Sequence, residues 1–167
     1  MENPIILIAG IPGSGKSRYA AWLQEHKGFL HIDLDEDEGG LLESAELKSF
    51  RDAAFEIGSA KPLVESLSKL SKPIVVDWGF PARYLGVVSA FKSAGMQLWW
   101  FDGDRMAARQ AFLSRGTVPA EALNAQMASI DESWCEIQRV FDSQVIETVS
   151  PGPRFLPPDR IFGKMFP

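Results

Sequence analysis

The sequence predicts an α/β protein whose parallel β-sheet is covered by helices on both faces. Five short apolar runs, at 4–10, 28–33, 72–78, 96–102 and 143–149, alternate with longer segments of helical periodicity. These runs are apolar at successive positions rather than at every second one, which is typical of parallel strands buried on two sides. Strands and helices in repeated alternation indicate a doubly wound sheet.

The segments between the strands are expected to be helical. In 61–71, Leu63, Leu67 and Leu70 recur at the spacing of one helix face. The expected helices are 16–26, 42–57, 61–71, 81–94, 104–115, 120–128 and 131–142. The proline-rich tail after Ser150 shows no clear helix or strand, but its phenylalanines predict that it packs onto the domain surface; these are Phe155, Phe162 and Phe166.

Length and composition predict one globular domain covering residues 1–167. Hydrophobic residues make up 46% of the chain and charged residues 23%, which is ordinary for a globular protein. No apolar run reaches the roughly 20 residues that a membrane span requires. No basic segment precedes the first apolar run, which argues against a signal peptide. A single cysteine, Cys135, excludes an internal disulfide, so we expect a cytoplasmic protein without a membrane partner.

The charge of the chain argues against a nucleic-acid partner. The formal net charge is -5, and the isoelectric point is near 5.1. Proteins that bind duplex DNA usually present a basic face, because phosphate contacts dominate their affinity. We therefore expect a small molecule, rather than DNA or RNA, as the partner.

Residues 10–17, GIPGSGKS, match the pattern G-x-x-x-x-G-K-[ST] at every fixed position. The glycines permit backbone angles that turn successive N–H groups toward an anion, and the following helix N-terminus reinforces that nest. Lys16 brings a positive charge to the outer phosphates, and the Ser17 hydroxyl is placed to bind Mg²⁺. The pattern predicts a nucleoside triphosphate site. The expected nucleotide contacts are Gly10, Ile11, Pro12, Gly13, Ser14, Gly15, Lys16, Ser17 and Arg18.

The strand PIVVD ends in a carboxylate, Asp77, beside this loop. Proteins with this loop place an acidic residue there to help hold the metal, so we predict that Asp77 lies near Mg²⁺, directly or through water. The alternative is that Asp77 caps the next helix. Arg83 is a candidate for binding a substrate anion, or else a solvated arginine at a helix start. Trp78 is the tryptophan best placed to stack on a ligand.

Asp33 and Asp35 follow a strand in HIDLDEDEGG, at the sheet edge where open α/β folds bind ligands. We predict that one of them accepts or orients the proton of an acceptor hydroxyl while the γ-phosphoryl group departs. Asp33 is also a candidate for the metal site. The alternative is a solvated acidic turn, because residues 36–38 are acidic as well.

Arginines follow the fourth expected strand in RMAARQAFLSRG. Phosphoryl transfer needs positive charge over the phosphate oxygens as negative charge shifts there. Arg115 precedes a loop and is predicted to act from a lid, and Arg109 to contact a phosphate or the adenine side of the nucleotide. The alternative is that both are surface arginines paired with nearby acidic residues, namely Asp102, Asp104 or Glu121.

These motifs resemble those of small P-loop kinases, in the AAA-like ATPase or predicted-kinase group related to shikimate kinases, zeta toxins and polynucleotide 5′-kinases. The matching stretches are GIPGSGKS, HIDLD, VVDWGFPAR and LWWFDGDRMAARQAFLSR, within residues 4–115. The resemblance implies a three-layer P-loop NTPase fold with a five-stranded parallel sheet of order 2-3-1-4-5. It also implies ATP, Mg²⁺ and transfer of the γ-phosphoryl group to a hydroxyl of a small molecule.

The same resemblance implies roles for single residues. Lys16 and Ser17 would serve the phosphates and the metal, Asp33 or Asp35 the base, and Asp77 the second acidic position, with Arg115 in the lid. Two regions depart from the pattern. The lid segment, 115–130, is short, and after Arg115 it has no basic residue, whereas many relatives bring arginines there. The expected acceptor-binding region, 36–71, carries no known substrate signature.

Two other functions are compatible with these motifs. One is a nucleotide-binding switch that hydrolyses ATP slowly or not at all, which the sparse lid favours. The other is a polynucleotide or nucleotide-sugar kinase, against which the acidic charge weighs. Either a monomer or a homodimer is compatible with the sequence.

Overall fold

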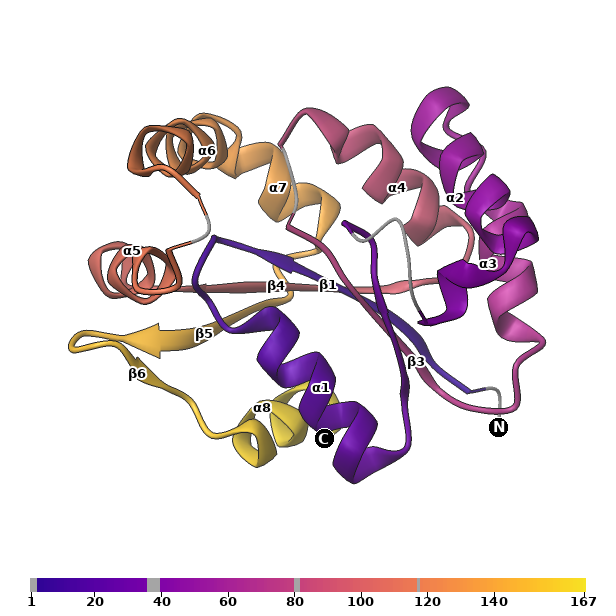
Figure 1. The fold of residues 1–167 in the computed structure, drawn as a ribbon, viewed down its shortest axis with the longest axis horizontal. Coiled ribbons are helices and arrows are strands. Elements are labelled where there is room, and N and C mark those ends of the chain that lie inside the picture. Colours follow the sequence, from indigo (N-terminus) through magenta and orange to yellow (C-terminus); the bar gives the residue numbers. More distant parts are fainter. Residues whose placement is uncertain (1–2, 36–39, 80–81, 117) are drawn as a thin grey trace.

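The sheet of the protein has six strands in the order β2-β3-β1-β4-β5-β6 (Figure 1). The computed structural model describes residues 3–35, 40–79, 82–116 and 118–167. The strands are β1 (Ile5–Gly10), β2 (Leu30–Asp33), β3 (Ile74–Asp77), β4 (Gln97–Gly103), β5 (Val145–Ser150) and β6 (Arg154–Phe155). The first five pair in parallel, which confirms the predicted order, and β6 adds an antiparallel edge beside β5.

Helices cover both faces of this sheet, as predicted. They are α1 (Lys16–Lys27), α2 (Ala45–Ile57), α3 (Lys61–Ser68), α4 (Leu85–Ser93), α5 (Arg105–Leu113), α6 (Ala120–Glu132), α7 (Trp134–Val140) and α8 (Pro158–Met165). Two short 3-10 turns, η1 (Gly40–Glu43) and η2 (Ala82–Tyr84), precede α2 and α4. Helices α1 and α8 lie on one face, and α4 and α7 lie on the other (Figure 1). Among the described residues, no helix has the length and apolarity to cross a membrane.

Each face of the sheet has its own hydrophobic core, which explains why the strands are apolar at successive positions. In β1, Ile6 and Ile8 pack with residues of α1 and α8. Their neighbours Ile5 and Leu7 pack with residues of α2, α3, α4 and α7. The four side chains are at most 7% exposed, so β1 is the central strand of both cores.

The expectation that the tail has no regular structure is wrong, because the tail forms β6 and α8. Pro158 stands at the first turn of α8, where its fixed φ angle suits a helix. Ile161 and Met165 bury one face of α8 in the core beside α1, and Phe162 packs against the same core. The expectation that the tail packs onto the domain is confirmed. The sequence did carry a helical signal, because Ile161 and Met165 are four residues apart, but the segment has only eight residues and begins at a proline.

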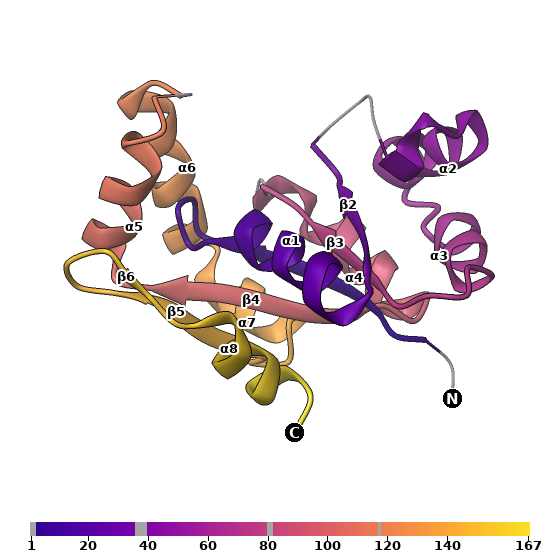
Figure 2. The ribbon, with the colours of Figure 1, turned by 60° about the horizontal axis from the view of Figure 1, so that its bottom comes forward.

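The loop between β1 and α1 lies where the parallel strands end. Helices α5 and α6 stand at one end of the molecule, and α2 and α3 stand at the other (Figures 1 and 2). Ligands of open α/β folds bind at this edge of the sheet. The fold therefore brings the loop, the ends of β2 and β3, and α5 and α6 toward one region.

Candidate active site

The loop of residues 10–17 is shaped by glycines at positions where a side chain would be strained. Gly13 has a φ angle of +79° and Gly15 one of +86°, in the left-handed region that favours glycine. A Cβ atom on Gly13 would lie 2.0 Å from the carbonyl oxygen of Ala108. Helix α5 therefore packs directly against the backbone of the loop, and this close approach fixes the path of the chain.

Side-chain hydrogen bonds hold the loop in place from within and from β5. The Ser14 hydroxyl donates to the carbonyl oxygen of Ile11 at 2.8 Å. The Thr148 hydroxyl donates to the carbonyl oxygen of Ser14 at 2.7 Å, and both hydroxyl groups are buried. The loop is thus anchored to β5.

The loop borders a cavity of about 280 Å³, here called the loop cavity. It is lined by Pro12, Gly13, Gly15, Lys16, Ser17, Asp33, Asp35, Asp77, Gly79, Phe112, Arg115 and Gln126. Two cationic and three acidic side chains thus share one small volume. The structure brings together the loop, all three predicted carboxylates and the predicted lid arginine.

Lys16 lies inside this cavity with its ammonium group largely withdrawn from water. Its side chain donates to the carbonyl oxygens of Gly10 at 3.2 Å and Ile11 at 3.0 Å. Burial lowers the pKa of Lys16 to about 8, although the neighbouring carboxylates, Asp77 foremost, act in the opposite direction. The charged form of Lys16 is therefore less favoured here than that of a lysine in water.

Ser17 and Asp77 provide oxygen atoms suited to Mg²⁺. The Ser17 hydroxyl donates to Asp77 Oδ2 at 2.6 Å, and Asp77 is only 2% exposed. The other carboxylate oxygen of Asp77 lies 2.5 Å from His31 Nε2. Both oxygens therefore meet side chains of other elements, in place of the helix cap that was the alternative for Asp77.

The same residues fit a metal shared with a nucleotide better than a metal held by protein alone. Within the described part of the chain, no group of three or more His, Cys, Asp or Glu side chains is arranged to hold a metal ion. Mg²⁺ usually binds one or two carboxylates and completes its shell with phosphates and water. Ser17 and Asp77 are compatible with that pattern.

Asp33 ends β2 and Asp35 lies in the turn that follows, and hydrogen bonds with backbone N–H groups fix both carboxylates. Asp33 Oδ1 accepts from the Asp35 N–H at 2.9 Å, and Asp35 Oδ2 accepts from the Gly79 N–H at 2.7 Å. The turn is therefore tied to the end of β3 and faces the loop cavity. The acidic residues 36–38 that followed in the sequence lie outside the described residues.

The arginines reach different places. Arg115 follows the end of α5, is exposed and lines the loop cavity. Arg109 Nε donates to Asn124 Oδ1 at 3.2 Å.

The guanidinium carbon of Arg18 lies 5.7 Å from the ring centroid of Phe155, which directs this side chain toward β6. Asp102, considered as a partner of Arg109 or Arg115, pairs with Arg105 at 2.9 Å.

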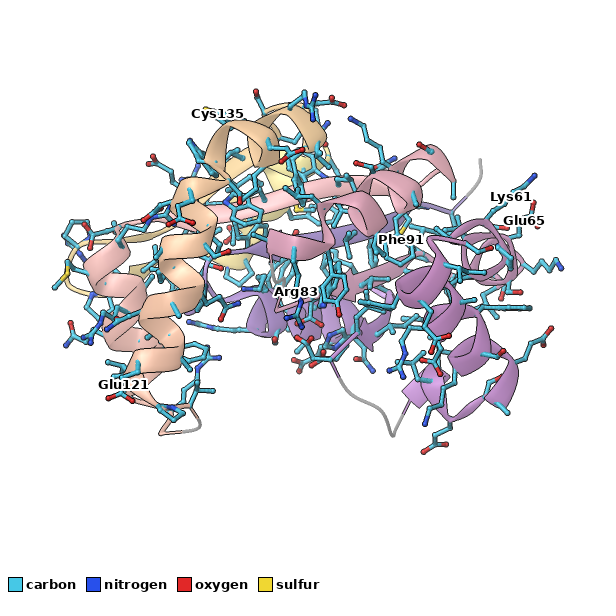
Figure 3. The ribbon with its side chains drawn as sticks, turned by 90° about the horizontal axis from the view of Figure 1, so that it is seen from above. Lys61, Glu65, Arg83, Phe91, Glu121 and Cys135 are labelled. Carbon is cyan, nitrogen blue, oxygen red and sulfur yellow. The ribbon has the colours of Figure 1, made fainter. Side chains whose placement is uncertain are left out.

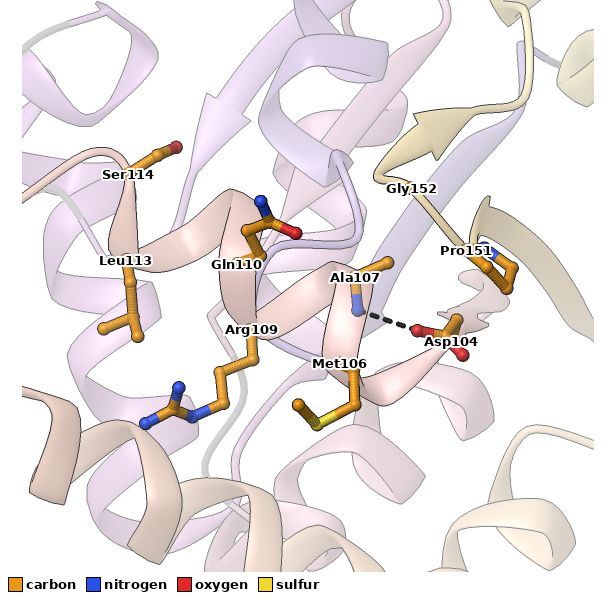
Figure 4. Close-up of a pocket in the computed structure, with 9 residues that line it drawn as sticks. All are labelled: Asp104, Met106, Ala107, Arg109, Gln110, Leu113, Ser114, Pro151 and Gly152. Atoms are coloured by element: carbon orange, nitrogen blue, oxygen red, sulfur yellow. Dashed lines mark hydrogen bonds between the residues drawn. The ribbon is translucent and has the colours of Figure 1, made fainter.

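Arg109 borders a second and larger cavity, of about 810 Å³, here called the α5 cavity (Figure 4). It runs from α5 to the turn between β5 and β6, and its lining is Asp104, Met106, Ala107, Arg109, Gln110, Leu113, Ser114, Pro151 and Gly152. The Asp104 carboxylate accepts from the Ala107 N–H at 2.7 Å and so caps the start of α5. Both cavities use α5 as a wall.

The two predicted substrate contacts that follow Asp77 in the sequence lie elsewhere. Trp78 is 2% exposed, and its ring meets Phe55 edge-on at 5.0 Å, so the prediction that it stacks on a ligand is wrong. Trp78 directly follows β3 and packs against Phe55 of α2, which places its ring in the core. Arg83, on η2, is exposed with its guanidinium 5.0 Å from the Tyr84 ring centroid (Figure 3). Among the described residues that line the loop cavity, Arg83 does not appear.

Sequence reasoning missed four residues of the site: His31, Gly79, Phe112 and Gln126. Gln126 Nε2 donates to the Gly79 carbonyl oxygen at 2.6 Å, so Gly79 connects α6 to Asp35. His31 had a usable signal, because alternation along a strand places it on the same face as Asp33. Gln126 had no such signal, because a single glutamine in a helix does not indicate which group it will bind.

Comparisons with protein-family models and with curated proteins find no match. Solved structures do match. A gluconokinase from Sinorhizobium meliloti 1021 is 17% identical over 98% of this chain and 89% of its own, with a TM-score of 0.52. A shikimate kinase from Bacteroides thetaiotaomicron is 10% identical over 86% and 85%, with a TM-score of 0.52. An uncharacterized protein from Eubacterium ventriosum ATCC 27560 is 16% identical over 98% and 96%, with a TM-score of 0.60.

At sequence identities of 10 to 17%, these matches show which fold the chain adopts. The chain has the three-layer α/β fold of small P-loop kinases such as gluconokinase and shikimate kinase, which confirms the fold that the sequence motifs implied. The sixth strand, β6, goes beyond the five that were predicted.

Proposed function

We propose that the protein is an ATP- and Mg²⁺-dependent kinase that transfers the γ-phosphoryl group to a hydroxyl of a small molecule. The observation that carries this proposal is the composition of the loop cavity. The Lys16 ammonium, the Ser17–Asp77 pair, the Asp33–Asp35 turn and Arg115 all line it. The likeness in fold to a gluconokinase and a shikimate kinase supports the same class of reaction.

In this proposal the nucleotide occupies both cavities. Its phosphates would lie against the loop N–H groups and Lys16, and Ser17 with Asp77 would hold Mg²⁺, which when bound neutralises part of the phosphate charge. The α5 cavity, beside the loop, would take the nucleoside. Its wall combines apolar side chains with the Arg109 guanidinium, a surface suited to a flat aromatic base.

We assign the base to Asp35 and a place beside the metal to Asp33. Asp33 is the direct neighbour of Asp77 in the β2–β3 register, whereas Asp35 is exposed and held by the Gly79 N–H. The acceptor oxygen bonds to the γ-phosphorus while the bond to the bridging oxygen breaks and ADP leaves. Asp35 takes the proton of the hydroxyl. Arg115 supplies positive charge at the same cavity.

The remaining assignments concern whole regions of the chain. We assign residues 115–130 as the lid and residues 36–71 as the acceptor-binding region of a single domain. Gln126 is the side chain that α6 presents to the loop cavity, in the place of the arginines that other lids carry. An amide hydrogen-bonds a hydroxyl without adding charge, which suits a neutral polyhydroxyl acceptor.

A screen with labelled ATP against pools of sugars, polyols and hydroxy acids tests the proposal. The Lys16→Ala variant should lose ATP binding, whereas Asp35→Ala should keep it and lose transfer by about 100-fold or more. Lys164→Ala is the matched control, because Lys164 is exposed on α8 and lies outside both the loop cavity and residues 36–71. Transfer at the native rate in both active-site variants would remove these residues from the reaction.

A nucleotide-binding switch is the second candidate, and the absence of a basic residue after Arg115 in 115–130 favours it. A switch would bind ATP and its non-hydrolysable analogue with the same consequences for a partner. Turnover of ATP that appears only when an acceptor is added would exclude it.

A further inference from the structure

The Asp77 carboxylate is held from two sides by side chains of two different elements. Its Oδ2 accepts the Ser17 hydroxyl of α1 at 2.6 Å, and its Oδ1 lies 2.5 Å from the Nε2 atom of His31 on β2. The Asp77 side chain is 3% exposed and that of His31 is 19% exposed. One carboxylate thus connects the end of the phosphate loop with the edge strand of the sheet.

The register of the sheet explains how His31 reaches Asp77. Strand β2 pairs in parallel with β3, and His31 lies opposite Val75, two residues before Asp77. Leu30 and Ile32 pack into the core on the α2 side, so the alternating His31 points to the α1 face, where Val75 is buried. The imidazole therefore approaches Asp77 along the diagonal between neighbouring strands, a distance that a long side chain can span.

A hydrogen-bond donor beside Asp77 Oδ1 stabilises the buried carboxylate. An ionised carboxylate buried in protein is costly unless its oxygens are hydrogen-bonded, and a bond to a charged acceptor is about twice as strong as a neutral one. Ser17 satisfies only one oxygen of Asp77. A proton on His31 Nε2 satisfies the other and fixes the plane of the carboxylate.

We propose that His31 is a positioning residue for the metal site. By donating from Nε2 to Asp77 Oδ1, it holds the orientation in which Oδ2 keeps the Ser17 hydroxyl, and it thereby raises the affinity of the site for the divalent cation of the metal–nucleotide complex. This inference rests on the proposed function. Partners of this kind, one bond removed from a metal site, typically change metal affinity by about 10- to 100-fold.

His31 acts through Asp77 rather than on the ligand. Among the described residues, those that line the loop cavity include Asp77 but not His31. Its role therefore differs from that of Asp35, which faces the cavity. Loss of His31 should weaken the metal contribution to nucleotide binding and leave the contacts of the loop with the phosphates in place.

The chain has two histidines, so a change at His26 can serve as the control for changes at His31. His31→Leu removes the donor and keeps an apolar side chain of similar size. His31→Gln places an amide nitrogen close to the position of Nε2, whereas in His31→Asn the amide stops short of Asp77. His26→Gln is the control, since His26 is exposed on α1 and its Nδ1 lies 3.2 Å from the Trp22 carbonyl oxygen.

The measurement is the dissociation constant of ATP by calorimetry, once with EDTA and once with saturating Mn²⁺. The ratio of the two constants reports how strongly the bound metal supports nucleotide binding. His31→Leu should lower this ratio by about 10- to 100-fold while changing the metal-free constant less than about twofold. His31→Gln should restore the ratio to within about threefold, and His26→Gln should match the wild-type protein. The hyperfine spectrum of bound Mn²⁺ should change in His31→Leu and stay as in the wild-type protein in His31→Gln and His26→Gln.

An unchanged ratio in His31→Leu, or an equal loss in the Leu and Gln variants, would overturn the inference. If His31→Leu does not fold, the Asn and Gln variants decide the question, because only Gln keeps the bond and equal ratios would contradict the proposal. Wild-type protein that binds no ATP in either buffer would end the proposed function and this inference together. Normal binding by the wild type with unchanged variants would end this inference alone.

Discussion

The two ends of the loop cavity place their chemical groups by different means. At the nucleotide end, a continuous stretch of residues 10–17 folds back on itself, and its backbone is buried against α5 and β5. At the acceptor end, Asp35, Gly79 and Gln126 come from three separate segments and are joined by hydrogen bonds of 2.7 and 2.6 Å. The first end is set by backbone packing, and the second depends on a few polar bonds that can rearrange.

This difference predicts unequal tolerance to the same small change, the addition of one methyl group. Gly13→Ala should abolish ATP binding, because its Cβ would lie 2.0 Å from the Ala108 carbonyl oxygen and its φ angle is +79°. The loop, α5 or both must then move. Calorimetry should show at least a 100-fold loss of affinity, since displaced amides cannot converge on the phosphates.

Gly28→Ala is the control for that loss. Gly28 has a similar φ angle of +72°, but nothing lies within 4 Å of its Cβ position. Only the strain of the left-handed backbone remains, about 1–2 kcal/mol in the free energy of unfolding. If the two variants bind ATP equally well, the loop is not set by its packing against α5.

At the acceptor end, Gly79→Ala should impair transfer without impairing nucleotide binding. Its Cβ would lie 2.5 Å from Asp35 Oδ2, the end of a side chain that can turn away. Asp35 would lose its bond to the Gly79 N–H, and we expect the transfer rate to fall by about 30- to 100-fold at an unchanged ATP dissociation constant. Gly86→Ala, with nothing within 4 Å of its Cβ position, should behave as the wild-type protein does. A parallel loss of ATP affinity would show that the two ends are not separable.

The same contrast explains what the sequence could predict. The nucleotide end is contiguous, so GIPGSGKS and the strand before it carried nearly all of its geometry in one motif. Asp33, Asp35 and Asp77 were found because parallel strands end at one edge of a sheet, a rule that places residues without knowing their partners. The five-stranded order followed from the resemblance to P-loop kinases.

The residues that were missed or misplaced depend on contacts between distant segments. Trp78 was assigned to the ligand because it follows Asp77, but the packing of Phe55 and Tyr84 around it decides its place. Gln126 acts through a backbone carbonyl group 47 residues away in the sequence, and no local pattern encodes such a pair. Similarly, the tail forms α8 because the core beside α1 accepts Ile161 and Met165.

The smallest effect that we expect concerns pH and belongs to the nucleotide end. Burial lowers the pKa of Lys16 in the free protein to about 8. A bound polyphosphate favours the charged ammonium and raises that pKa, so binding takes up a proton once the pH exceeds about 8. In the free protein, the Lys16 ammonium group loses its proton as the pH rises through about 8. ATP measured with EDTA should therefore bind about 10-fold more weakly at pH 9 than at pH 7.

Calorimetry at pH 9 in two buffers of different ionisation enthalpy measures the proton uptake directly, and it should approach one proton for each ATP bound. Lys16→Arg keeps its charge over this range, so any binding that it retains should be independent of pH and free of proton uptake. The Gly79→Ala variant, altered only at the acceptor end, should show the wild-type pH dependence. A wild-type dissociation constant that stays flat from pH 7 to 9 would contradict a lowered pKa of Lys16 in the free protein.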